Sequence, residues 1–312
     1  MFPVVPIDVR PEVAAALQAG RPVVAQASAA IAHSLPWPEN LEIARQVEVA
    51  ARQEGATFAL VAVWQGRLTV GLGPAEVEAL ARGGSSFRAS RRDLATAVAR
   101  KKTAATTVAA SMYLAHRAGI QLLSTGAIGG AARGTGDSWD VSADLVELER
   151  TPVAVVSAGA RSVLDLARTA EVLESYGVPV VGYGTDSFPA FYQRPGSQPA
   201  SVRIDDPAQV AALLAAHWGM DGAGVVLAQP TPSAVALSPD DLQPALREVE
   251  NQAAKAGVRA RDLPPVLMDR LNRMTGGRAL RAYQAILVAN ARLAAQVARE
   301  LALLEKRPPG PG

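Results

Sequence analysis

The sequence predicts an α/β protein, a three-layer α/β/α sandwich built around a mainly parallel sheet. The main observation is alternation, because short apolar runs of strand character are separated by longer runs whose apolar residues recur every three or four positions. The chain of 312 residues is also 49% hydrophobic, which is enough to bury a substantial core. No break in composition resembles a linker. We therefore expect one domain over residues 1–306 and a disordered proline- and glycine-rich tail over residues 307–312.

The expected strands are short runs rich in valine, leucine and alanine. In chain order they cover Pro22–Ala25, Phe58–Trp64, Ile120–Leu123, Val153–Val156, Val178–Val181 and Gly224–Leu227. Gly66 predicts a tight turn that joins the second of these runs to a hairpin partner at Leu68–Val70.

The expected helices alternate with these strands until about residue 230. They include Pro38–Glu54, Arg91–Lys101, Thr106–Ala118, Ser162–Tyr176 and Pro207–Trp218. The rest of the chain is helical in pattern, over Pro239–Ala256, Pro264–Met274 and the alanine-rich Arg278–Leu304. We expect these last helices to pack over the sheet or at a subunit interface.

Composition excludes several classes of function. The chain has no cysteine, which rules out disulfides, zinc thiolates and thiol nucleophiles and fits a cytoplasmic protein. We find no signal peptide at the N-terminus and no apolar run of about 20 residues, so we expect no membrane association. The net charge is only +2 and aromatic residues make up 4% of the chain, so we expect no nucleic-acid partner.

Arg161 lies where α/β folds place reactive groups. It follows the predicted strand Val153–Val156 in the segment Ser157-Ala-Gly-Ala-Arg161, a turn of small residues that leads into a helix. A lysine at this position could form a Schiff base with a sugar aldehyde. An arginine cannot, because it stays protonated and offers no amine lone pair.

Other polar segments also follow predicted strands or open predicted helices. Ser90 and Arg91 could bind a phosphate, or could simply be a helix cap with a solvated arginine. Thr107 and the free backbone N–H groups beside it could form an anion site, or the threonine could only cap its helix. Thr125 and Gly126 form a glycine-rich turn that permits close approach of a ligand, although such turns end many strands.

Two carboxylates and one histidine complete the candidate site. Asp140 and Asp144 have the spacing of one helical face and could hold Mn²⁺ or Mg²⁺, partly through water. The alternative is one N-cap and one exposed acid. His33 lies in a proline-rich loop and could line a pocket.

Taken together, these segments resemble the pseudouridine-5′-phosphate glycosidase family. The resemblance begins at Arg21-Pro-Val-Val-Ala25 and ends near Thr275-Gly-Gly277, and it includes Ser90-Arg-Arg-Asp93, Thr125-Gly-Ala-Ile-Gly-Gly130 and Asp140-Val-Ser-Ala-Asp144. It implies an α/β/α homotrimer that uses Mn²⁺ to cleave the C–C glycosidic bond of pseudouridine 5′-phosphate reversibly, giving uracil and ribose 5-phosphate. Relatives of the family make C-ribosylated natural products, as in alnumycin biosynthesis.

The resemblance divides the site into matching and departing positions. The phosphate-side and metal-side positions match the family at Ser90, Arg91, Thr107, Thr125, Asp140 and Asp144. The family's Schiff-base lysine corresponds to Arg161, its second lysine to Arg88 and its proton-shuttling glutamate to Ala27. A family histidine corresponds to Ala132, and an asparagine corresponds to Tyr283.

These departures leave two hypotheses for the function. Loss of a general acid–base costs roughly 10²–10⁴-fold in rate, and loss of the lysine removes the Schiff-base route altogether. The first hypothesis is a diverged enzyme of a C-nucleotide or C-glycoside pathway, which acts on a phosphorylated sugar without a Schiff base. The second is a pseudoenzyme that binds a phosphosugar or partners an active paralogue. Among the lysines, Lys102 lies nearest to the Ser90–Thr107 region, so it is the candidate for a relocated nucleophile.

Overall fold

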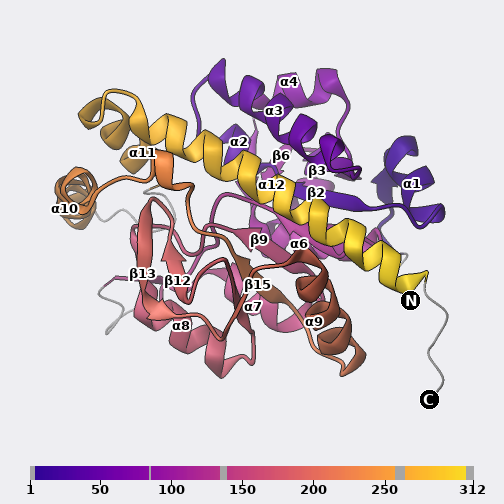
Figure 1. Ribbon diagram of the computed structural model, residues 1–312. Coiled ribbons are helices and arrows are strands. Elements are labelled where there is room, and N and C mark those ends of the chain that lie inside the picture. The colour runs from indigo at the N-terminus through magenta and orange to yellow at the C-terminus, as the bar shows by residue number, and fades with distance from the viewer. Residues whose placement is uncertain (1–3, 84–85, 134–138, 257–263, 307–312) are drawn as a thin grey trace.

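A large mixed sheet forms the centre of the computed structural model, which describes residues 4–83, 86–133, 139–256 and 264–306 (Figure 1). Its eleven described strands are β1 (Ile7–Val9), β2 (Val23–Ala27), β3 (Thr57–Trp64), β4 (Arg67–Val70), β5 (Phe87–Ala89), β6 (Ala104–Thr106), β7 (Leu122–Ser124), β9 (Ala154–Ser157), β11 (Val180–Tyr183), β14 (Val202–Ile204) and β15 (Val225–Ala228). The main path through the sheet is β1-β4-β3-β2-β7-β9-β15-β11-β14, while β6 pairs with β3 and β5.

Parallel pairing brings the carboxyl ends of the central strands together. The strands from β2 to β14 along this path are parallel to one another and to β3. The strands β4 and β6 pair antiparallel with β3, and β1 and β5 pair parallel with β4 and β6. In the register of the three central strands, Gln26 of β2 lies beside Ser124 of β7, which lies beside Val156 of β9. Residues that follow these strands therefore meet at one edge of the sheet, the edge at which ligands bind in α/β folds.

Helices cover both faces of the sheet. The described helices are α1 (Pro11–Gln18), α2 (Ala29–Ala32), α3 (Glu39–Gln53), α4 (Pro74–Ala81), α5 (Leu94–Ala99), α6 (Val108–Arg117), α7 (Ala143–Arg150), α8 (Leu166–Ser175), α9 (Pro207–Gly219), α10 (Pro239–Ala256), α11 (Pro264–Met274) and α12 (Arg278–Glu305). In Figure 1, α12 runs in front of the sheet, where it packs on β2, β7 and β9 between α3 and α9, while α6 and α7 lie behind. This arrangement confirms the predicted sandwich. None of the described helices is both long and apolar enough to cross a membrane.

Most predicted elements lie within a few residues of the observed ones, and the hairpin through Gly66 is confirmed as the antiparallel pair β3–β4. The structure differs at three predicted helix starts. Residues Arg91–Asp93 form a 3₁₀ turn before α5, and Thr106 ends β6 rather than opening α6. Residues 162–165 are not helical, because the short strand β10 (Leu164–Asp165) pairs there with β8 (Ala131–Ala132) and Asp165 then caps α8.

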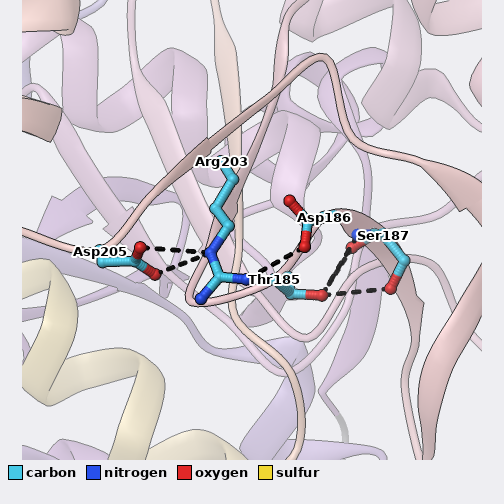
Figure 2. Close-up of polar contacts among 5 residues, drawn as sticks. All are labelled: Thr185, Asp186, Ser187, Arg203 and Asp205. Carbon is cyan, nitrogen blue, oxygen red and sulfur yellow. Dashed lines mark hydrogen bonds and ion pairs between the residues drawn. The ribbon is translucent and has the colours of Figure 1, made fainter.

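A two-stranded hairpin that the sequence analysis missed reaches towards the ligand-binding edge. It consists of β12 (Ser187–Ala190) and β13 (Gln193–Pro199). Figure 2 shows how it is tied to the main sheet: Arg203 of β14 pairs with Asp186 at the base of the hairpin, at 3.0 Å, and with Asp205 at 3.0 Å. The turn of the hairpin carries Phe191 and Tyr192 into the core, where both are buried.

Candidate active-site cleft

A cleft of about 520 Å³ lies at the carboxyl edge of the sheet and brings together six of the candidate residues. Its volume falls within the range typical of small-molecule sites. The described lining includes the aromatic residues Phe87 and Trp139 and the exposed Arg92. The candidate residues that it brings together are Arg88, Ser90, Thr107, Asp140, Asp144 and Arg161.

Arg88 and Arg161 supply the positive charge of the cleft. Arg88 is the middle residue of β5, and Arg161 follows β9, where its backbone N–H donates to the carbonyl oxygen of Ile128 at 3.3 Å. The turn before Arg161 requires Gly159, whose φ is +80° and whose missing side chain leaves room for the backbone of Pro189 in β12. Together with Arg92, these residues place three guanidinium groups in the described lining of the cleft.

Asp144 joins two backbone segments at the floor of the cleft. Its side chain is 2% exposed. One carboxylate oxygen accepts from the N–H of Ala109 at 2.9 Å, and the other accepts from the N–H of Gly129 at 2.8 Å. The carboxylate therefore holds the start of α6 against the glycine-rich turn after β7.

Asp140 and Asp144 do not share a helical face, so that expectation is wrong. Ser142 caps α7, which begins at Ala143, and Asp140 therefore lies before the helix. The carbonyl oxygen of Asp140 accepts from the N–H of Ala132 at 3.0 Å, in a strand-like arrangement. Both carboxylates still line the cleft. The described residues contain no cluster of three or more histidine, cysteine, aspartate or glutamate side chains that could hold a metal ion.

The expected anion site at the start of α6 is already partly filled. The hydroxyl of Thr107 accepts from the N–H of Ala110 at 3.4 Å, and Asp144 takes the N–H of Ala109. These N–H groups are therefore not free for a ligand, which corrects the expectation. Sequence reasoning could not foresee this, because the competing carboxylate is 35 residues away. Thr107 itself lies in the lining of the cleft.

Arg92, rather than Arg91, faces the cleft. The guanidinium carbon of Arg91 lies 3.2 Å from the centre of the Tyr113 ring, and its Nε is 3.6 Å from a carboxylate oxygen of Glu147. Arg92 lies in the cleft lining beside Ser90. The two neighbouring arginines are equivalent in the sequence, and only their packing separates them.

Thr125 and Gly126 lie beneath α12 and not in the described lining of the cleft. Thr125 is 2% exposed, and its carbonyl oxygen accepts from the side-chain amide of Asn290 at 2.8 Å. A Cβ on Gly126 would lie 2.5 Å from Cε2 of Tyr283, so this glycine is required by the ring above it. The sequence analysis missed Asn290, although a polar residue on the apolar face of the long helix was an available signal.

Tyr283 fills the space on the inner side of Arg161. A cavity of only about 30 Å³ remains there, bordered by Arg161, Ser34, Phe191, Tyr192 and Tyr283. The rings of Phe191 and Tyr283 pack edge to face with centroids 5.3 Å apart. A water needs roughly 10–15 Å³ on this measure, so the cavity has room for about two waters and not for a ring. Burial raises the pKa of the Tyr283 phenol.

His33 lies beside the cleft, and its pKa is lowered from the usual value. Burial is the main cause that lowers its pKa, Arg88 lowers it further, and a hydrogen bond with the backbone of Phe87 opposes them. Its Nε2 atom is buried and has no hydrogen-bond partner in the part of the chain that the structure describes.

The remaining candidates, Ala27, Ala132 and Lys102, contribute no proton-carrying side chain to the described lining of the cleft. Ala27 ends β2 and Ala132 ends β8, and both are buried methyl groups. Lys102 is exposed in the segment between α5 and β6, where its carbonyl oxygen accepts from the N–H of Gly66 in the β3–β4 turn, and it is not in the described cleft lining.

Comparisons with known proteins show the family of this chain. The model of the indigoidine synthase A-like protein family matches residues 12–300. A pseudouridine-5′-phosphate glycosidase of Herpetosiphon aurantiacus is 48% identical over 290 residues, covering 92% of this chain and 95% of the relative. The chain belongs to the pseudouridine-5′-phosphate glycosidase family. A second glycosidase of this family, from Methylobacterium nodulans, is 45% identical and covers 98% of this chain and 90% of its own.

Two solved structures place the whole chain in the same fold. The prealnumycin C-glycosynthase AlnA, in complex with ribulose 5-phosphate, has a TM-score of 0.88 and 36% identity, covering 97% of this chain and 99% of its own. An indigoidine synthase A-like protein of Thermotoga maritima has a TM-score of 0.86 and 31% identity, covering 97% of this chain and 98% of its own. This member of the family therefore carries the family fold along nearly its full length.

Proposed function

We propose that this protein binds a phosphorylated ribose in the cleft and acts in a C-nucleotide or C-glycoside pathway without a Schiff-base lysine. One observation carries the proposal: the cleft is lined by Arg88 and Arg161, and no lysine is among its described lining residues. Relatives named as pseudouridine-5′-phosphate glycosidases and a C-glycosynthase solved with ribulose 5-phosphate support a sugar phosphate as the ligand.

The charge and hydrogen-bonding groups of the cleft suit a phosphate monoester. Arginine binds phosphate through two parallel N–H donors, and such charge-assisted bonds are roughly twice as strong as neutral ones. Arg88 and Arg161 lie in the same lining as the hydroxyl-bearing residues Ser90 and Thr107. We assign the phosphate and sugar hydroxyls to these four residues, with Arg92 at the rim.

A divalent cation, Mn²⁺ or Mg²⁺, fits beside the phosphate at Asp140 and Asp144. Both oxygens of Asp144 already accept an N–H, yet each carboxylate oxygen has a second lone pair. Two carboxylates supplemented by water and a phosphate oxygen make a donor set of the kind that Mg²⁺ and Mn²⁺ prefer. The cation would add positive charge to that of the arginines in the same lining.

Titration calorimetry with ribose 5-phosphate, with and without Mn²⁺, tests the pocket. Arg88→Ala and Arg161→Ala should each weaken binding strongly, whereas Arg299→Ala, an exposed arginine of α12, should not. Absence of binding by the unaltered protein in both conditions would refute the proposed pocket.

The chemistry is tested separately. With pseudouridine 5′-phosphate and Mn²⁺ we expect no uracil release, and with ribose 5-phosphate and borohydride we expect no covalent adduct. Mass spectrometry of the treated protein reads out the adduct. Uracil release, or a trapped adduct at any lysine, would refute the proposal that the Schiff-base mechanism has been lost.

A pseudoenzyme is the second candidate function, and the alanines at positions 27 and 132 favour it because neither can carry a proton. In that case the protein binds the phosphosugar or partners an active paralogue. Binding of ribose 5-phosphate without turnover of any C-nucleotide would favour the pseudoenzyme over the diverged enzyme. We also propose a homotrimer, which light scattering of the purified protein tests.

A further inference from the structure

Trp139 is the most exposed large hydrophobic residue at the cleft. Its side chain is 99% exposed, and it lies in the same lining as Arg88 and Arg161. Single exposed hydrophobic residues are common and need no explanation on their own. Trp139 differs because it borders a charged cleft of ligand size.

The backbone that carries Trp139 is anchored. Its carbonyl oxygen accepts from the N–H of Val141 at 2.9 Å. The next residue, Asp140, accepts from Ala132 at 3.0 Å, and Val141 bridges to Ala131 of β8. The indole is therefore displayed from a segment fixed to the wall of the cleft, which limits the entropy lost when a ligand stacks on it.

The space around Arg161 leaves few directions for a group attached to the sugar. The inward direction ends at the cavity of about 30 Å³ behind Tyr283, which cannot hold a ring. A second cleft of about 480 Å³ also borders Arg161, and its described lining offers the amides of Gln193 and Gln243 but no aromatic side chain. Of these two larger clefts, the main one alone has aromatic side chains in its described lining, those of Phe87 and Trp139.

We propose that Trp139 is the stacking platform for the planar ring that the C-linked ribose 5-phosphate of the proposed function carries. This inference rests on the proposed function, because it assumes that the sugar phosphate lies against Arg88 and Arg161. Among the described residues none covers the indole, so the site accepts a ring system larger than a single pyrimidine. Stacking on an aromatic side chain gains from ring area and tolerates different ring chemistries.

Calorimetry with three ligands tests the platform: ribose 5-phosphate, pseudouridine 5′-phosphate and a C-linked naphthyl ribose 5-phosphate. The unaltered protein should bind the naphthyl ligand most tightly. Trp139→Ala should weaken its binding by about 5- to 150-fold, the usual loss for one stacked base, and leave ribose 5-phosphate unchanged. Trp139→Phe should keep most of the affinity. Tyr176→Ala, at an exposed aromatic residue that ends α8, is the matched control and should change none of the three.

Three results would overturn the platform while leaving the phosphosugar pocket intact. They are an unchanged naphthyl affinity in Trp139→Ala, an equal loss for ribose 5-phosphate, and a loss of naphthyl binding in Gln243→Ala instead. A change of oligomeric state in Trp139→Ala with unchanged naphthyl affinity would assign the residue to a subunit interface and also overturn it. If none of the three ligands binds, the proposed function itself fails and this inference fails with it.

Discussion

Substituting Gly126 by alanine should destabilise the protein, because the new methyl group would collide with the ring of Tyr283. The Cβ would lie 2.5 Å from Cε2 of that ring, whereas non-bonded carbons normally stay about 3.5–4.0 Å apart, so one of them must move by about 1 Å. The ring cannot move easily, since it is 5% exposed and packs edge to face against Phe191. Overpacking of this kind costs about 1–3 kcal/mol of unfolding free energy.

Urea denaturation followed by circular dichroism measures this cost. Gly219→Ala is the matched control, because Gly219 ends α9 and a Cβ there meets no atom within 4 Å. We expect it to be neutral or slightly stabilising. In a Tyr283→Ala background the cost of Gly126→Ala should largely disappear, since the obstructing ring is gone. If the two substitutions were instead additive, the ring would not lie on the turn, and the claim that Tyr283 closes the inner side of Arg161 would be refuted.

Three further predictions concern the groups around the cleft. Asp144→Asn should lower the unfolding free energy by about 1–3 kcal/mol, because an amide cannot accept from both Ala109 and Gly129; a midpoint of urea unfolding equal to that of the unaltered protein would contradict this. His33 should titrate below 6.5 in NMR spectra, because burial and the nearby guanidinium of the cleft lower its pKa. Because the pKa is lower in the folded chain, the unfolded chain binds this proton at a higher pH. The His33 contribution therefore lowers the free energy of unfolding as the pH falls below 6.5, and a His33 titration midpoint at or above 6.5 would exclude this effect. Arg203→Ala should hardly change the melting temperature, and any change should vanish in high salt, because its ion pairs are exposed; a large, salt-independent loss would show that the hairpin depends on it.

The fold class followed from local patterns alone. Buried parallel strands such as β9 and β15 read as unbroken apolar runs, and α12 shows the helical period along almost its whole length. The position of Arg161 after a strand also predicted its place at the carboxyl edge of the sheet, where the structure has it. The strands β12 and β13 escaped prediction, because their proline- and glycine-containing sequences lack strand character.

Only the tertiary structure decided which groups each side chain contacts. The sequence alone determined which residue types follow which strands, and so predicted a charged site with arginine where a lysine could have reacted. It could not show that Arg92 rather than Arg91 faces the cleft, or that Asp144 and Thr107 occupy the N–H groups expected to bind an anion. Asn290 meets the backbone of Thr125 across 165 residues of chain. Such contacts depend on how layers of the sandwich pack, and packing joins residues whose separation along the chain leaves no local pattern to read.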